Sequence, residues 1–421
     1  MTTYNVAEAI QMLSRPGDPS QELRDLKVTQ RLWRRNGREY TILRYDKEAL
    51  DKSRECIETT GLFRSIVLED GKIKCFAPPK SLDRGLFTVL LDGGECYAEE
   101  FIEGTMINMF YDDSLPEDEV LGHWEIATRS SVGGETRFFS NSKNEGKTFR
   151  DMFIEALTEI TQEHESPRDA LESLNKEYSY SFVLQHPENR IVTEFKSPGL
   201  YLVSVYNIDN STHTITSVSM EEALGDSNAQ WVKTPKLYGQ NLTQEDLDGL
   251  VRLWTSEDTD YSIPGIVLRD RITGLRSKIR NAEYEKVRRL RGNQPKLQYR
   301  FLSLRQGAAE DIKAYLQYYP EDRDEFANYG RQVHSFTHNL HQQYLDCKVR
   351  KVKDIKSVPF EYRNHVYTLH GHYLESLRPK AGVVTRRVVE TYVDDLPAAR
   401  LMFSINYPLA AKHRCQEAHT V

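Results

Sequence analysis

The segment FRSIVLEDGKIKCF, at residues 63–76, decides the fold class of this chain. Its apolar residues form two short runs that are separated by Asp70 and Gly71. An Asp-Gly pair supplies the positive backbone angles of a tight hairpin turn, so two antiparallel strands are predicted here. Comparable runs predict further strands at FTVLL (87–91), EFIEGTMINMFYD (100–112), HWEIATRSS (123–131), YSFVLQH (180–186), RIVTEF (190–195), YLVSVYNI (201–208) and IPGIVLRD (263–270). The chain is therefore predicted to be α+β with a largely antiparallel sheet.

Helical spacing appears once among these strands, at 148–163, and then dominates the end of the chain. Beyond 293 the strand signals fade, and helices are predicted within 332–349, 362–377 and 385–396. The Gly-Asn-Gln-Pro sequence at 292–295 breaks the preceding helix. We therefore predict an N-terminal lead-in at 1–60, a strand-rich domain at 61–292 and an all-helical C-terminal domain at 293–421.

The composition is that of a globular protein, with 39% hydrophobic and 28% charged residues among 421. The sequence has neither a long apolar run nor a basic-then-apolar start, which predicts a cytoplasmic protein with no membrane partner. Its five cysteines form no C-x-x-C pair and are expected to be reduced. Histidines 334, 338 and 341 share a helix face; a metal site and ordinary solvated or core histidines are both open.

The net charge of -7 hides two basic stretches, at 276–305 and 348–356. Basic residues on helices suit RNA phosphates, although a solvated helix face is the plainer alternative. Tyrosines that are interleaved with basic residues beyond 315 suit base stacking, and core packing explains them equally. The candidate RNA-binding residues are Arg288, Arg289, Arg291, Lys351 and Lys353.

Six segments in order resemble the motifs of the ATP-dependent RNA ligases of the phage tRNA-repair type. They are residues 63–82, 100–112, 124–131, 180–192, 263–270 and 275–281. The resemblance covers about residues 60–292. It implies a nucleotidyltransferase domain with the ligase adenylation fold, in which the nucleotide lies between antiparallel sheets, and a separate helical C-terminal domain.

The resemblance carries a set of mostly basic residues over to this chain. They match family positions around the nucleotide and its phosphates: Arg64, Lys80, Glu103, Arg129, Lys278 and Arg280. ATP or another nucleotide is therefore the expected ligand, and RNA the expected partner.

Three positions depart from the family pattern. Phe101 stands where the family has the lysine that attacks the α-phosphorus, and a phenyl ring is not a nucleophile. Ser181 and Pro264 stand where the family has glutamates, so the support for Mg²⁺ is lost. No catalytic residue is therefore assigned. The sequence favours a catalytically degenerate RNA-ligase-like protein that binds nucleotides or RNA ends. Two alternatives stay open: an active ligase with an unusual nucleophile, and a non-catalytic scaffold for a protein partner.

Overall fold

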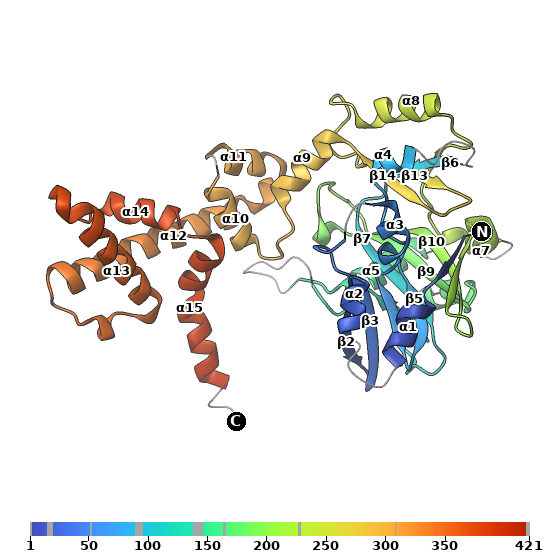
Figure 1. Ribbon diagram of the computed structural model, residues 1–421, viewed down its shortest axis with the longest axis horizontal. Coiled ribbons are helices and arrows are strands. Elements are labelled where there is room, and N and C mark those ends of the chain that lie inside the picture. Colours follow the sequence, from blue (N-terminus) through green and yellow to red (C-terminus); the bar gives the residue numbers. More distant parts are fainter. Residues whose placement is uncertain are drawn as a thin grey trace. The chain divides into compact units, whose positions relative to one another are not determined.

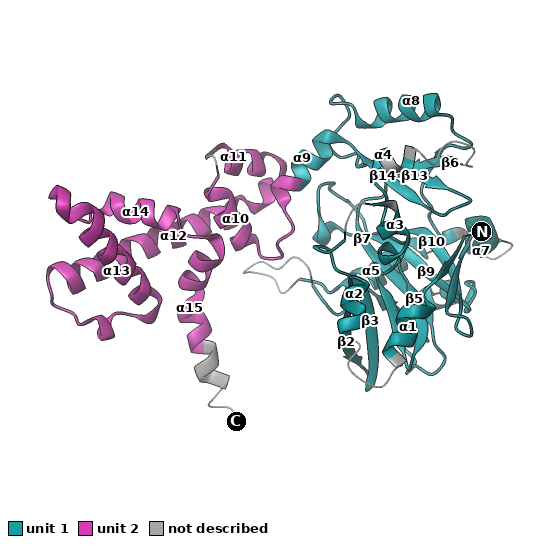
Figure 2. Ribbon diagram, viewed as in Figure 1, with its two compact units in different colours: residues 1–138, 146–288 teal, residues 139–145, 289–421 magenta. Residues whose placement is uncertain are grey.

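The chain is described by a computed structural model, which covers residues 2–14, 20–50, 53–88, 96–137, 146–162, 166–225, 229–307 and 309–417. It divides into two compact units (Figure 2). Unit 1 holds residues 1–138 and 146–288, and unit 2 holds residues 139–145 and 289–421. The division falls between Arg288 and Arg289, within a helix, rather than at 292.

A six-stranded antiparallel sheet forms the centre of unit 1 (Figure 1). Its strand order is β1 (Thr3–Asn5), β11 (Thr214–Val218), β10 (Gly199–Asp209), β9 (Tyr178–Gln185), β7 (Thr105–Tyr111) and β8 (Trp124–Ala127). Helices α5 (Phe149–Ile160) and α6 (Pro167–Glu172) pack their apolar sides onto it. Thr148 begins α5 with a capping box, which satisfies the first free amides of the helix.

The segment at 63–76 belongs to a second, four-stranded antiparallel sheet. Its order is β2 (Val28–Arg35), β3 (Arg38–Tyr45), β4 (Ile66–Glu69) and β5 (Lys72–Phe76). The predicted hairpin is confirmed: Asp70 and Gly71 both have positive φ, at 48° and 75°. One face of the sheet packs on Phe110 and Ala127 of the central sheet, and the other packs on the N-terminal helices.

Residues 1–60 are therefore an integral part of unit 1 and not a separate lead-in. Strand β1 pairs with β11, and β2 and β3 extend the hairpin of β4 and β5. Helices α1 (Ala7–Ser14) and α2 (Ser20–Asp25) bury Val6, Ile10 and Leu23 against this sheet. The prediction of a separate lead-in differs from the structure because strands β1 and β3 pair with strands that lie outside residues 1–60.

A third sheet has the order β12 (Leu237–Gly239), β6 (Cys96–Glu100), β13 (Gly265–Asp270) and β14 (Arg276–Arg280). One face packs on α3 (Arg54–Glu58), α4 (Arg84–Thr88) and α8 (Gln244–Thr255). Ile266, Leu268 and Ile279 lie on this covered face. Successive side chains of a strand alternate, so the residues between them point to the opposite side.

Two strand predictions, at 87–91 and at 190–195, differ from the structure in the described residues. Phe87 and Thr88 of FTVLL end helix α4, and the residues after them lie outside the described ranges. The segment 190–195 has bends instead of strand, because its backbone amides at 192 and 193 bind a buried carboxylate. Short apolar runs such as these do not distinguish a strand from other buried backbone.

Unit 2 is helical throughout its described part, as predicted (Figure 1). It contains the end of α9 (Ala282–Arg291), then α10 (Leu297–Arg305), α11 (Ala309–Tyr318), α12 (Arg323–Tyr344), α13 (Phe360–His372), α14 (Arg386–Asp394) and α15 (Ala398–Glu417). Aromatic rings fill its interior, including Phe301, Phe326 and Tyr315. The α+β class with antiparallel sheets, followed by a helical region, is confirmed.

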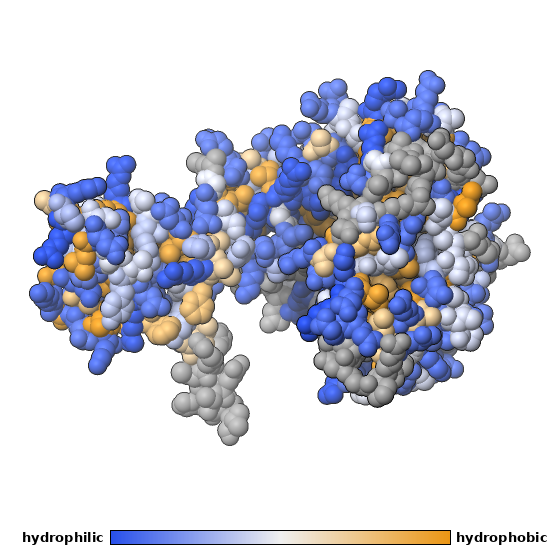
Figure 3. Space-filling view, viewed as in Figure 1, coloured by the Kyte–Doolittle hydropathy of each residue, from blue (hydrophilic) through white to orange (hydrophobic). Residues whose placement is uncertain are grey.

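The surface is mostly hydrophilic with scattered apolar residues on the face drawn in Figure 3. Of the described helices, none has an apolar stretch of the length that a membrane span requires. Cys56, Cys75, Cys96 and Cys347 are free thiols, and the side chain of Cys415 lies outside the described residues.

Candidate phosphate-binding site

The uncovered face of the third sheet carries a row of cations. Arg276, Lys278 and Arg280 alternate with the buried Ser277 and Ile279 along β14, so all three project from the face opposite α8. Arg269 on β13 pairs with Arg276 across the strands and projects from the same face. Its Nη2 donates to the Val203 carbonyl of β10 at 2.8 Å, which places this face toward the central sheet.

Phe101 lies directly beneath two of these cations. The Lys278 ammonium nitrogen is 4.5 Å from the centre of the phenyl ring, and the Arg280 guanidinium carbon is 5.6 Å from it. A ring face attracts a cation and leaves the hydrogen-bond donors of the cation free. The Phe101 ring therefore serves as a platform for Lys278 and Arg280.

Two further cations, Arg64 and Lys80, come from the segment between β3 and α4 and join the cluster. The Lys80 amide donates to the Gly61 carbonyl at 2.9 Å and the Leu82 amide donates to the Arg276 carbonyl at 2.8 Å, so the backbone places this segment beside β14. Arg64 is one of the causes that lower the pKa of Lys278 and of Lys80. Lys80 donates to the neighbouring Ser81 carbonyl at 3.2 Å. The structure thus brings together Arg64, Lys80, Lys278 and Arg280, which the sequence assigned to one site. Together with Arg276 and Phe101 they are called the cation pocket below.

The cation pocket has little counter-charge. In the described part of the chain, Arg64, Lys80 and Lys278 form no ion pair with a carboxylate. Desolvation is the largest cause that lowers the pKa of Lys278, well below its usual range, and Arg276, Arg64 and Arg280 lower it further. Two cations of this face do have a carboxylate partner: Glu285 lies 3.0 Å from Arg280 Nε, and Glu99 lies 2.5 Å from Arg269 Nε. Uncompensated, partly buried cations describe a site for an anion.

Arg276 is more structural than the other cations. Its side chain is buried and its Nη2 donates to the carbonyls of Pro78 and Pro79, at 3.2 and 2.8 Å. These bonds fix the loop that carries Lys80. Desolvation, Arg64 and Arg269 lower the pKa of Arg276, so its charge adds to the field of the pocket.

Glu103 does not project into the cation pocket. Its buried carboxylate accepts hydrogen bonds from the amides of Val192 and Thr193, at 2.8 and 3.1 Å, and from the Thr193 hydroxyl at 2.9 Å. The residue assigned to nucleotide binding therefore anchors the 190–195 segment. The adjacent Gly104 has φ of 150°, and a Cβ there would lie 2.3 Å from the Leu184 carbonyl oxygen, so only glycine fits.

Ser181 and Pro264, the positions at which the sequence resemblance implies glutamates, do not fit Mg²⁺. The Ser181 hydroxyl is fully buried and donates to Asn108 Oδ1 at 2.8 Å. Pro264 offers only its backbone carbonyl, which accepts from the Asn281 amide at 3.0 Å. No group of histidine, cysteine or acidic residues suited to a metal ion occurs among the described residues, the predicted histidine cluster at 334–341 included. A divalent ion requires several oxygen ligands, whereas the carboxylate that the described strands place on this face, Glu99, is already held by Arg269.

Arg129 lies beside the cation pocket with a separate set of neighbours. Its guanidinium carbon is 4.9 Å above the Tyr45 ring, and its Nη2 donates to the Tyr45 carbonyl at 3.3 Å. It still acts on the pocket, because it lowers the pKa of Arg64.

The candidate RNA-binding residues of α9 differ in how free they are. Arg288 is held by both oxygens of Glu285, each at 3.0 Å, whereas the Arg289 side chain is exposed. Arg291 points into unit 2, where it donates to Asp322 at 2.9 Å and to the Tyr315 hydroxyl. The Arg291 guanidinium therefore stabilises unit 2 through these two partners.

Lys351 and Lys353 lie in the exposed connection between α12 and α13. Lys353 is 3.6 Å from Asp346, and Lys351 has an exposed side chain. Nearby, Lys348 lies 5.3 Å above the centre of the Tyr367 ring, and 55% of Tyr367 is exposed. An exposed ring beside lysines has the composition of a surface for unpaired bases.

Sequence reasoning missed Arg269, Arg276 and the platform role of Phe101. The period-two spacing of Arg276, Lys278 and Arg280 would have shown that these three cations share a face. Arg269 belongs to β13 and Phe101 directly follows β6, and only the pairing of these strands brings the two residues beside β14.

Part of the chain is homologous to an RNA ligase. The RNA ligase of Rhodothermus phage RM378 is 28% identical over 113 residues, which are 26% of this chain and 23% of that protein. The match thus spans about a quarter of that relative. No protein family profile matches the chain.

Two solved structures show limited likeness. An archaeal ATP-dependent RNA ligase has 16% identity and a TM-score of 0.41, covering 76% of this chain and 77% of that one. A mutant Naegleria gruberi RNA ligase with ATP and Mn has 10% identity and a TM-score of 0.34, covering 52% of this chain and 56% of that one.

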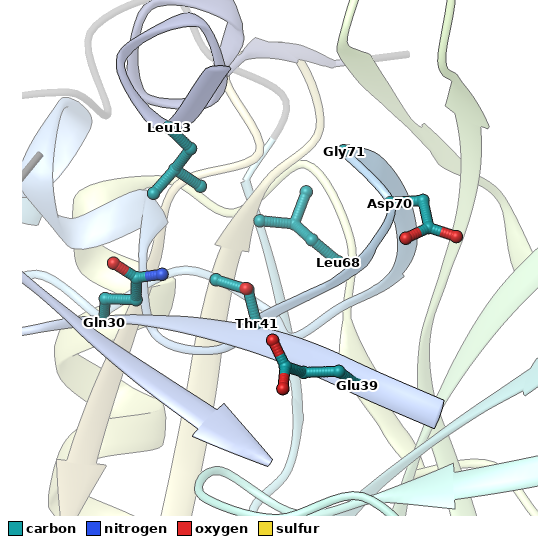
Figure 4. A pocket seen from close by; sticks show the side chains of 7 residues that line it. All are labelled: Leu13, Gln30, Glu39, Thr41, Leu68, Asp70 and Gly71. Carbon is teal, nitrogen blue, oxygen red and sulfur yellow. The ribbon is translucent and has the colours of Figure 1, made fainter. Parts of the chain in front are cut away.

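A pocket of about 380 Å³ lies elsewhere in unit 1 (Figure 4). It is lined by Leu13, Gln30, Glu39, Thr41, Leu68, Asp70 and Gly71. Its two charged side chains are acidic, so it does not suit a phosphate.

Proposed function

We propose that unit 1 is an RNA-ligase-like nucleotidyltransferase domain that binds the phosphates of a nucleotide, such as ATP, or of an RNA end, without transferring a nucleotidyl group. The observation that carries the proposal is the charge of Lys278 above the Phe101 ring, together with Arg64 and Lys80, which have no ion pair with a carboxylate in the described part of the chain. The partial homology to an RNA ligase supports it.

Phosphate is the ligand that this chemistry favours. A dianionic phosphate accepts several charge-assisted hydrogen bonds at once, and each is about twice as strong as a neutral one. Lys278 and Arg280 present their donors away from an aromatic face, and Arg64 and Lys80 approach from another segment. The cations themselves supply the neutralising charge, so binding requires no divalent ion.

Transfer is disfavoured by the same residues. Covalent adenylation requires an amine beside the α-phosphorus and charge stabilisation of the leaving pyrophosphate, commonly by a metal ion. Phe101 offers no amine, and Ser181 and Pro264 offer no carboxylate. The domain therefore holds a phosphorylated ligand and leaves it unchanged.

The test is direct binding to the full-length protein in EDTA. Isothermal titration with ATP, with inorganic tripolyphosphate and with RNA carrying a 5′-phosphate or a 5′-hydroxyl should show binding of the first three and weaker binding of the last. An absence of heat up to millimolar ATP, together with equal affinity for both RNA ends, contradicts the proposal and favours a scaffold for a protein partner.

One observation favours a second candidate, an active ligase with a relocated nucleophile. The Lys278 amine has a strongly lowered pKa and lies beside the position of the family's lysine. A neutral amine is nucleophilic. In this case Lys278 Nζ forms the P–N bond, the α–β phosphoanhydride bond breaks and pyrophosphate leaves. Incubation with α-labelled ATP and Mn²⁺, followed by peptide mapping, distinguishes the two: label on Lys278 supports transfer, and no label supports binding alone.

We also propose that unit 2 contacts RNA through Arg289, Lys351 and Lys353. Their support is exposure together with a basic, tyrosine-bearing surface between α12 and α13. Arg288 and Arg291 contribute less, because carboxylates already hold their guanidinium groups.

A further inference from the structure

A second group of cations lies along β3 and the turn after β8, beside the cation pocket. Arg44 Nη1 donates to the Ser130 hydroxyl at 2.7 Å, next to Arg129, and Arg129 is held by Tyr45. Lys47 follows shortly after β3 and is electrostatically coupled to both arginines. The sequence analysis named Arg129 but did not group it with Arg44 and Lys47, because residues 44–47 and 129 are far apart in the chain.

The two arginines have unused donors. The Nε atoms of Arg44 and Arg129 are buried and have no hydrogen-bond partner among the residues that the structure describes. A buried, unpartnered donor on a charged group is unfavourable unless a ligand satisfies it. The Nε of Arg276 in the cation pocket has the same status, so both groups contain guanidinium donors that the described residues leave unsatisfied.

Among the described residues, the charges that act on Arg44 and Lys47 are cations, while the carboxylates of Asp46 and Glu48 flank Lys47 in the chain. Desolvation is the largest cause that lowers the pKa of Arg44 and of Lys47, and every charged neighbour that affects either residue is another cation: Arg129 and Arg31 for Arg44, and Arg129, Arg44 and Arg64 for Lys47. Like charges repel unless an anion lies between them. This group therefore resembles the cation pocket, because the charges that act on its members are mostly positive.

Arg64 links this group to the cation pocket. The Tyr45 amide donates to the Phe63 carbonyl at 2.5 Å, so Arg64 directly follows the residue that binds the end of β3. In agreement with this position, Arg64 lowers the pKa of Lys47 as well as that of Lys80 and Lys278. At the far end, Arg31 of β2 is exposed, and its guanidinium carbon is 4.9 Å above the Trp33 ring. The register pairs Thr29 with Arg44 and Arg31 with Ile42, so Arg31 and Arg44 project from the same face.

We propose that Arg64, Arg129, Lys47, Arg44 and Arg31 form a track that binds successive phosphates of a single nucleic-acid strand. This inference rests on the proposed function for the end of the strand, whose terminal phosphate occupies the cation pocket. A free nucleotide reaches only the pocket end of the track. The ligand of unit 1 is then a strand with several phosphodiester groups rather than a mononucleotide.

The experiment compares two double variants of the full-length protein. Arg44→Gln/Lys47→Gln removes two charges from the middle of the track. Arg34→Gln/Lys72→Gln is the control, because it removes the same charge from exposed positions of the same sheet; Arg34 is 84% exposed and pairs with Glu39. The probes are a 5′-phosphorylated, single-stranded RNA of twelve nucleotides, its DNA counterpart and ATP.

The expected result is selective for the strand. RNA binding to the track variant weakens at least tenfold relative to the control, and the salt slope of the affinity falls by roughly 1.4 if two contacts are lost. ATP affinity stays within twofold of the unmodified protein. The melting temperature does not fall, because the substitutions remove like charges from one another. Equal effects on DNA and RNA identify phosphodiester recognition, and a preference for RNA identifies the 2′-hydroxyl as an added contact.

Two results overturn the track. An RNA affinity and salt slope equal to those of the control show that these cations do not contact the strand. An equal loss of ATP affinity shows that they belong to a mononucleotide pocket. If the unmodified protein binds neither ATP nor a 5′-phosphate preferentially, the proposed function fails; a loss of RNA binding in the track variant then still supports the track.

Discussion

Replacement of Lys278 by methionine separates ligand binding from stability. Methionine keeps most of the aliphatic length that lies over Phe101 but removes the charge. Loss of one charge-assisted contact to a phosphate costs about 1.5–3 kcal/mol, which is roughly ten- to a hundredfold in affinity. The folded protein without ligand, however, loses a cation that Arg276, Arg64 and Arg280 repel. Lys278→Met should therefore weaken ATP binding by that factor while the melting temperature stays the same or rises.

The pH dependence follows from the same residue. The pKa of Lys278 is lower in the folded chain than in the unfolded chain, so the unfolded state binds more protons between the folded-state pKa and about 10.4. The free energy of unfolding should rise with pH in that window, and this rise should be smaller in Lys278→Met. ATP affinity should change in the opposite direction, because a bound phosphate favours the protonated amine.

The assay is isothermal titration of ATP in EDTA at several pH values, in two buffers with different heats of ionisation. Lys286→Met is the matched control, since Lys286 lies on α9 of the same unit and pairs with Glu283. The reasoning is refuted if Lys278→Met binds ATP as well as the control does. It is equally refuted if the melting temperature falls in step with the affinity, because Lys278 would then be structural.

Three further predictions concern single side chains. Glu103→Gln should lower the free energy of unfolding by about 1–3 kcal/mol, since an amide offers one acceptor oxygen to three donors; urea denaturation measures it, and an unchanged midpoint contradicts the anchoring role. Burial lowers the pKa of His365 to about 4, so the helices of unit 2 should lose up to about 3 kcal/mol as pH falls from about 6.5 to 4; hydrogen exchange of α13 should show this loss in the unmodified protein and not in His365→Gln. Lys351→Ala should reduce the salt slope of RNA binding by about 0.7 without a change in melting temperature. Arg291→Ala should instead lower the melting temperature, because it removes the hydrogen bond from Arg291 to Asp322. The reverse pattern would show that Arg291 is the RNA contact.

The sequence by itself determined the features that depend on local chemistry. The Asp70-Gly71 turn and the helical spacing at 148–163 and beyond residue 293 each predicted the observed element, because turn angles and amphipathic spacing depend on residues close together in the chain. The order of the motif segments likewise pointed to a set of cations and to the absence of a lysine at Phe101.

Only the tertiary structure decided which of these residues act together. The pairing of the strands placed Lys278 and Arg280 over Phe101. The Glu103 carboxylate, a candidate ligand contact in the sequence, is buried and binds the backbone amides of residues 192 and 193 instead. Residues 1–60 joined the sheets, and Arg44 reached Arg129, through pairings between segments that are distant in sequence. Charge repulsion and desolvation depend on separation in space, which composition and spacing along a chain do not specify.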